Sequence, residues 1–231
     1  MKSLIKMRFQ ITLLLVLMLL VSCKKEGIVS QINTQKIDNL EKINRPDYET
    51  FKKSISISKL KLKAKSFDEK SNFFYKLIND EIYPYWKGTS WDFNGTTQKP
   101  QKGEIACGYF ITNTLTDLGF KIERTKLAQA VSSKMIKELC VDIERFSRIE
   151  NVEKYLKTQP KNSVFIVGLD FHTGYILKDS TGNYFLHSNY IDRKGVMKEK
   201  INESTALNSS RSFMIGNLSN NKKLIDNWIN N

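Results

Sequence analysis

The chain has 231 residues, of which 40% are hydrophobic, so it is long enough for one domain with its own core and too apolar for a disordered polymer. Its 37 lysine and arginine residues exceed the 24 acidic residues by 13. An excess of this size makes nucleic-acid binding the first hypothesis to test, and the position of the charges decides it.

The first 23 residues have the order of an export signal. Lys2, Lys6 and Arg8 precede an apolar run over residues 11–21, and Ser22 and Cys23 follow it. Such a run reaches only about 16 Å as a helix, whereas about 20 residues are needed to span the hydrocarbon of a bilayer. The sequence therefore predicts a signal peptide over residues 1–22 rather than a transmembrane anchor.

The end of the apolar run resembles a bacterial lipobox, in which the cysteine receives lipid on its sulfur and becomes the new N-terminus. The resemblance implies lipidation of Cys23 and a protein anchored to a membrane of the bacterial cell envelope. An ordinary cleaved signal with an incidental cysteine is the alternative. The mature chain keeps 34 basic residues, an excess of 10, which favours contact with anionic envelope polymers over contact with nucleic acid.

Composition divides the mature chain into a tether and a folded domain. Residues 23–65 are rich in lysine, serine and asparagine, with scattered apolar residues, and predict a tether that carries one weak helix near residues 47–54. The domain is predicted over residues 66–231. It begins with a capping box at Ser66 and Glu69, before apolar residues at helical spacing up to Pro84, which is expected to end that helix.

The order of the remaining elements predicts an α+β fold. A turn-rich loop at 87–104 leads to a helix over 107–118 that Gly119 ends. Two further helices are expected near 126–139 and 143–156, and a last one at 224–229. β-Branched and aromatic runs between turn signals predict an antiparallel sheet of about five strands, at 164–169, 173–178, 184–189, 195–200 and 212–218.

The two histidines of the chain, His172 and His187, fall within one predicted hairpin. If the turn is centred between residues 180 and 181, position 172 opposes Asn189 and His187 faces position 174. His187 then lies diagonal to His172 on the same face, about 7–8 Å away and less at the Cβ atoms. A slip of one residue would place the two rings on opposite faces.

Cys107 lies at the beginning of a predicted helix, where the helix dipole stabilises a thiolate. A cysteine nucleophile also needs a base, for which His172 is the candidate, and a polar group that orients the base, for which His187 is the candidate. The alternative is a core cysteine, because Cys107 shares an apolar stripe with Phe110 and Ile111.

Four segments resemble the NlpC-type papain-like cysteine peptidases. Gly88–Gly95 resembles their glycine-rich approach segment, and Ala106–Phe110 occupies the place of their nucleophile motif. His172–Leu177 is similar to the strand that bears the base, and Tyr184–Ser188 to the strand that bears the third member of the triad. The segments also follow each other in the order of the family.

The resemblance implies a papain-like fold, in which N-terminal helices carrying the nucleophile pack on the sheet, and a Cys107, His172, His187 triad. Asn189 is the alternative third member, in the manner of papain itself, and Asp170 and Asp192 are weaker substitutes. The implied activity is hydrolysis of amide or peptide bonds, with peptidoglycan peptides as the substrate class and no cofactor.

The nucleophile motif departs from the family at the positions that bind a substrate amine. The family has aspartate before the cysteine and Ser-Gly after it, whereas this chain has Ala106, Gly108 and Tyr109. These three residues and Trp91 are predicted to line the substrate cleft. Without the carboxylate, recognition of a free N-terminal L-alanine is not expected even if amide hydrolysis is retained.

Other chemistries fit the sequence less well. A Cys107–Cys140 disulfide, possible in an exported protein, would abolish the nucleophile. No His or Cys set has the spacing of a metal site. The main alternative function is a non-catalytic papain-like lipoprotein that binds wall fragments or a partner protein, and a weaker one is acyl transfer or lipid-directed chemistry by the same triad.

Overall fold

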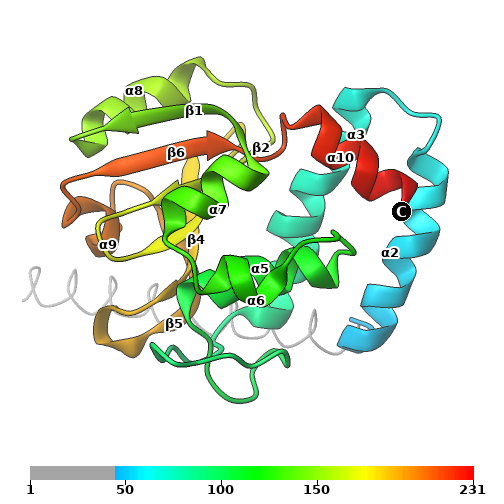
Figure 1. Cartoon of the computed structure of the whole chain (residues 1–231), viewed down its shortest axis with the longest axis horizontal. Helices are drawn as coiled ribbons and strands as arrows, with labels where there is room; N and C mark the ends of the chain where they lie inside the picture. The colour runs from blue at the N-terminus through cyan, green and yellow to red at the C-terminus, as the bar shows by residue number, and fades with distance from the viewer. Residues whose placement is uncertain (1–44) are drawn as a thin grey trace, which may run out of the picture. The chain divides into compact units, whose positions relative to one another are not determined.

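In the computed structural model, which describes residues 45–231, six antiparallel strands form one sheet between two groups of helices (Figure 1). The expected signal peptide, Cys23 and the first part of the tether lie outside the described residues. Residues 48–231 form one compact unit. Within the described range, no helix is long and apolar enough to cross a membrane.

The sheet confirms the predicted α+β class and adds one strand to it. The predicted strands occur within one residue of their expected bounds, and β1 is the addition. Strands β2 to β5 follow each other as neighbours, whereas β6 returns to pair with β2, in the order β1-β6-β2-β3-β4-β5. The strands are β1 Val141–Phe146, β2 Ser163–Gly168, β3 Thr173–Lys178, β4 Asn183–Asn189, β5 Gly195–Lys200 and β6 Phe213–Asn217.

The helix predicted over residues 143–156 is wrong in its first half. Residues 141–146 form β1, which pairs with β6, and helix α8 follows at Ile149–Thr158. Residues 141–144 alternate between half-buried and exposed, as expected for an edge strand rather than a helix. Charged residues on the exposed face of β1 obscured this two-residue period.

Apolar residues on the two faces of the sheet belong to two separate cores. On β4, for example, Leu186 points into a core with the helices that lie between residues 48 and 139 and with the C-terminal helix, whereas Phe185 points to the opposite face. The second core lies under α8 and the short helix α9, Thr205–Asn208. Because both faces are covered, β2 is buried along its whole length.

The capping box at Ser66 and Glu69 is present, with both reciprocal hydrogen bonds, and helix α3 runs from Phe67 to Lys76. Pro84 does not end the helical segment as predicted. A π-helical turn, Leu77–Ile82, comes first and passes into helix α4, Tyr83–Trp86, with the proline in its first turn. The π-helical turn directly before Pro84 marks where the hydrogen-bond pattern of the segment changes around a residue that lacks an N–H.

The predicted tether is also shorter than expected, because residues 48–62 form helix α2 of the compact unit. Phe51 and Ile55 are buried, and Lys59 lies along the same stripe with its ammonium on the carbonyl oxygen of Trp228, at 3.0 Å. The stripe holds only two apolar residues, and the stem of a lysine completes it. Lysine-rich composition therefore concealed a packed helix.

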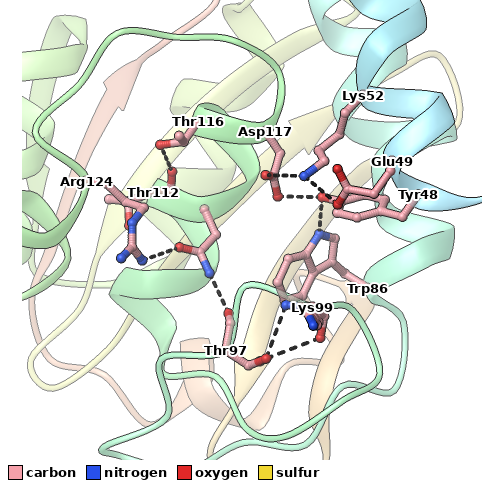
Figure 2. Close-up of polar contacts among 11 residues, drawn as sticks. Tyr48, Glu49, Lys52, Trp86, Thr97, Lys99, Thr112, Thr116, Asp117 and Arg124 are labelled. Carbon is pink, nitrogen blue, oxygen red and sulfur yellow. Dashed lines mark hydrogen bonds and ion pairs between the residues drawn. The ribbon is translucent and has the colours of Figure 1, made fainter.

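Polar side chains attach α2 to the rest of the domain, as Figure 2 shows. The Trp86 indole N–H donates to the Tyr48 hydroxyl at 2.7 Å, which in turn donates to Asp117 at 2.6 Å. Lys52 lies 3.6 Å from the same carboxylate. Asp117 is the last residue of helix α5, Cys107–Asp117, so α2 contacts the end of the helix opposite to Cys107.

The remaining helices follow α5 and close the domain. The expected helix over residues 126–139 is divided into α6, Arg124–Ala128, and α7, Ser132–Leu139. Figure 1 shows α6 beside α5 and α7 beside the sheet, as their contacts require. The last helix, α10, spans Lys222–Asn230 and packs against α2 and α3.

Candidate active site

Cys107 is the first residue of α5, at the end of a loop that backbone hydrogen bonds hold in place. The Ile105 N–H donates to Ser90 O at 2.9 Å, and the Ala106 N–H donates to Gly95 O at 2.8 Å. A Cβ atom on Gly95 would lie 2.5 Å from Ile105 N, so this close approach requires glycine. The Ser188 hydroxyl of β4 donates to Ile105 O at 2.7 Å, which fixes the start of α5 against the sheet.

Cys107 is half-buried, whereas Phe110, Ile111 and Leu115 on the same stripe are fully buried. It is also outside the hydrophobic core cluster that contains those residues. The interpretation of Cys107 as a core cysteine therefore does not fit its position. Cys140 is the buried cysteine, and both thiols are free, so the Cys107–Cys140 disulfide is absent.

The sulfur of Cys107 lies among backbone N–H groups. Burial raises the pKa of the Cys107 thiol, and the N–H groups of Thr173, Gly108 and Cys107 itself oppose this effect by favouring the thiolate. Ala106, the N-cap residue, has no side chain that could accept hydrogen bonds from the first turn. Thr173 is the residue next to His172, so the thiol lies near the start of β3.

The hairpin register is the predicted one. Tyr175 pairs with Leu186, and the same register places Gly174 opposite His187. A Cβ atom on Gly174 would come within 2.7 Å of the His187 Cβ, and this glycine therefore leaves room for the His187 side chain. His172 Nε2 and His187 Nδ1 lie 2.8 Å apart, at hydrogen-bonding distance.

The alternative partners of His172 interact elsewhere. The Asn189 amide accepts from Ile191 N at 2.8 Å and donates to the Met197 sulfur at 3.1 Å. Asp170 accepts from Arg211 N and the Ser212 hydroxyl in an exposed turn. Asp192 is exposed and lies 3.7 Å from Lys194. His187 is the candidate third member that the structure places against His172.

Aromatic rings surround the histidine pair. Phe185 stacks on His187 with the ring centroids 4.0 Å apart, and Tyr190 lies 5.0 Å from the ring of His172. His172 is 5% exposed and His187 is fully buried. Burial lowers the pKa of both imidazoles, most strongly that of His172, where the neighbouring His187 acts in the same direction. Burial thus favours the neutral form of both rings, although Glu199 opposes this effect at His187.

The sequence interpretation missed Glu199, which lies behind the pair. Its Oε1 is 3.2 Å from Nε2 of His187. Glu199 opposes Phe185 across β4 and β5, and His187 opposes Met197, so Glu199 is the diagonal neighbour of His187 on one face. The diagonal-neighbour rule, which relates His172 to His187 in the hairpin of β3 and β4, identifies Glu199 when it is applied to β4 and β5.

Two of the four residues predicted to line the substrate cleft are packed in the interior. A Cβ atom on Gly108 would lie 2.3 Å from Ala128 O, so this glycine allows α6 to approach α5. Tyr109 is 9% exposed and accepts a hydrogen bond from Gln129 at 3.1 Å. The side of Gly108 that would carry a Cβ atom and the ring of Tyr109 are thus packed against neighbouring residues, and a role of these two positions in the substrate cleft stays a prediction.

Ala106 and Trp91 remain half-buried beside the site. The Trp91 ring lies 6.2 Å from that of Tyr190, the residue in contact with His172, and Arg193 lies 6.0 Å from the Trp91 ring. Arg193 also pairs with Asp92 and Glu104. This ion-pair group joins the loop before Cys107 to the loop after β4.

Residues 45–231 contain no group of three His, Cys, Asp or Glu side chains that could hold a metal ion. Comparison with known proteins gives no match for the chain among family models, curated proteins or solved structures. The resemblance to NlpC-type peptidases therefore rests on the motifs quoted above, and the function has to be argued from the geometry of the site.

Proposed function

We propose that this protein is a lipid-anchored cysteine hydrolase of the bacterial cell envelope, with a papain-like fold, that cleaves amide or peptide bonds in peptidoglycan peptides. One observation supports it above others. The Thr173 amide, at the start of β3, faces the sulfur of Cys107, and His172, the residue directly before this strand, is in contact with a second imidazole at 2.8 Å.

The contacts of the ring nitrogens support a division of roles between the two histidines. Nε2 of His172 is occupied by His187, which leaves Nδ1 of His172 as the base for the Cys107 thiol. As the sulfur attacks the carbonyl carbon, Nδ1 takes the thiol proton and the carbonyl electrons move to oxygen. The backbone N–H groups at the start of α5 stabilise this oxyanion.

Collapse of the tetrahedral intermediate completes acyl transfer to the enzyme. The C–N bond breaks, and His172 Nδ1–H protonates the leaving amine, so that a thioester with Cys107 remains. Water then attacks the thioester as His172 takes its proton, the C–S bond breaks, and the proton returns to the sulfur. Acid and free thiol are regenerated without a cofactor.

Substrate selection is expected to differ from that of enzymes with an acidic residue before the nucleophile. Ala106 offers no carboxylate to a free ammonium group, and Tyr109 is turned into the interior toward Gln129. Phe171, directly before the base, is 97% exposed. We infer that the substrate presents an apolar or uncharged group, rather than a free amine, beside the scissile amide.

The test is product analysis with matched cysteine variants. Purified protein, Cys107→Ala and the control Cys140→Ala are incubated with peptidoglycan and with stem peptides, free and acylated at the amine, and the products are identified by mass spectrometry. Wild type and Cys140→Ala are expected to release the same new termini, and Cys107→Ala none. Equal product profiles for wild type and Cys107→Ala contradict the proposal.

A non-catalytic wall-binding lipoprotein is the second candidate, favoured by the raised pKa of the Cys107 thiol. It predicts that wild type and Cys107→Ala bind muropeptides with equal affinity and that neither changes them. Isothermal titration with both proteins, followed by mass spectrometry of the recovered ligand, distinguishes this function from hydrolysis.

A further inference from the structure

Glu199 lies behind the two histidines, where His187 connects it to His172. His187, whose side chain is fully buried, places Nδ1 at 2.8 Å from His172 and Nε2 at 3.2 Å from the Glu199 carboxylate. Both nitrogens of this imidazole therefore have partners within the protein. The side chain of Glu199 is only 16% exposed, so its carboxylate is largely withdrawn from water at this contact.

Contacts around Glu199 keep it ionised. Burial raises the pKa of this carboxyl, but hydrogen bonds from His187 and from the Ser204 hydroxyl, together with the positive charge of Lys194, outweigh burial and lower the pKa below its ordinary value. Ser204 is itself fixed, because it is the N-cap of α9 and accepts from Leu207 N at 3.3 Å.

An ionised carboxylate can only accept a hydrogen bond, and this determines which ring nitrogens of His187 and His172 carry a proton. His187 must donate from Nε2, so its Nδ1 carries a lone pair and accepts. His172 must then donate from Nε2 to His187, which leaves Nδ1 of His172 without a proton. The opposite set of tautomers would place a proton on that Nδ1 and remove its ability to act as a base.

We propose that Glu199 is a positioning residue that fixes both imidazoles as Nε2–H tautomers and so makes His172 Nδ1 the base for Cys107. The proposal rests on the proposed hydrolase function and extends the Cys107, His172, His187 set by a fourth member on a different strand. Glu199 acts through His187 and does not touch the reacting atoms.

The two histidines of the sequence make a direct test possible. The full mature chain, labelled with ¹⁵N in histidine, gives only two imidazole spin systems, and long-range ¹H–¹⁵N spectra distinguish protonated from unprotonated ring nitrogens. Wild type is expected to show Nε2–H and unprotonated Nδ1 for both rings. A His172→Gln variant assigns the two sets of signals.

Variants of Glu199 then separate positioning from a structural role. Glu199→Ala is expected to give a mixture of tautomers at His187 and His172 in a folded protein. Glu199→Gln should retain Nε2–H, since its amide oxygen accepts the same hydrogen bond. Glu203→Gln, four residues along the chain in an exposed ion pair with Lys200, is the matched control and should resemble wild type. Wild-type tautomers in folded Glu199→Ala overturn the proposal.

Kinetics provide the second readout. Glu199→Ala is expected to lower kcat by about 10- to 100-fold with little change in KM, and Glu199→Gln to recover most of this loss.

The two proposals fail in different ways. If Cys107→Ala retains wild-type hydrolysis, the hydrolase function fails whatever the tautomers are. If Cys107→Ala is inactive but Glu199→Ala retains wild-type kcat, the role of Glu199 fails alone.

Discussion

Burial acts on the candidate nucleophile and base in opposite directions. It raises the pKa of the Cys107 thiol and lowers the pKa of the His172 imidazole, and in both cases it favours the uncharged form. The resting pair is therefore a thiol and a neutral imidazole. Proton transfer then accompanies attack on the substrate instead of preceding it, so His172 acts as a general base in the attack step itself.

This pair predicts a broad pH profile for kcat/KM of peptide hydrolysis. Activity requires His172 unprotonated and Cys107 protonated before transfer. Because the pKa of His172 lies below its ordinary value of 6.5, the acidic limb should fall below pH 6.5. Because the pKa of Cys107 lies above its ordinary value of 9.0, the alkaline limb should lie above pH 9.0. Steady-state rates across this range test it, and limbs inside these limits contradict it.

The residues of the site differ in how far sequence could reveal them. Cys107, His172 and His187 belong to rare residue types in this chain, and the hairpin register relates the two histidines correctly. Glu199 is one of many acidic residues, and only the pairing of β4 with β5 makes it a neighbour of His187. Gly108 was assigned to the substrate cleft from its place in the nucleophile motif, and no signal in the sequence marks its close contact with Ala128 of α6.

Helix α2 shows how an element can depend on a few polar contacts. The Tyr48 hydroxyl connects Trp86 Nε1 to the Asp117 carboxylate, as Figure 2 shows, and both Trp86 and Asp117 lie outside α2. Burial raises the pKa of Asp117, while the Tyr48 hydroxyl and Lys52 oppose this effect. The hydroxyl therefore satisfies one donor and one acceptor in a largely buried setting.

Tyr48→Phe should lower the free energy of unfolding by about 1–3 kcal/mol, since it leaves the Trp86 N–H and an Asp117 oxygen without their partner. Equilibrium urea unfolding, monitored by tryptophan fluorescence, measures the change. Tyr184→Phe is the matched control, because the Tyr184 hydroxyl contacts Thr181 at an exposed turn and its loss should cost less than about 0.5 kcal/mol. Equal losses in the two variants contradict a specific role of Tyr48.

Elements with strong local signals were predicted well, and elements defined by distant partners were not. The capping box fixed the start of α3, and Gly119, at a φ of +89°, ended the helical segment of α5. Most of the five predicted strands are rich in β-branched and aromatic residues, as β2 is, whereas β5 has only Val196 and was recognised by the turn signals around it. β1 was missed because its strand character depends on pairing with β6, which is about 70 residues away in sequence.

At the scale of the whole molecule, the two ends of the compact unit pack against each other. Lys59 of α2 donates to the carbonyl of Trp228 in α10, and the Trp228 indole N–H donates to Leu118 O at 2.7 Å. Trp228 also stacks on Phe120, with the ring centroids 4.8 Å apart. Residues from α2, the segment after α5 and α10 thus form one continuous part of the first core.

This arrangement predicts that the domain boundary lies before Tyr48 and not at Ser66. A chain of residues 66–231 loses the burial of Phe51 and Ile55, worth about 1.5–3 kcal/mol each, and uncovers the polar groups that Tyr48 and Lys59 satisfy. That sum is a large part of the about 5–15 kcal/mol by which domains are stable. Circular dichroism measures the melting temperature of each chain, and residues 45–231 are expected to melt cooperatively. Each kcal/mol moves the melting temperature of a domain of this size by roughly 2–4 °C, so residues 66–231 should melt at a temperature lower by about 10 °C or more. Equal melting temperatures for the two chains would show that α2 belongs to the tether after all.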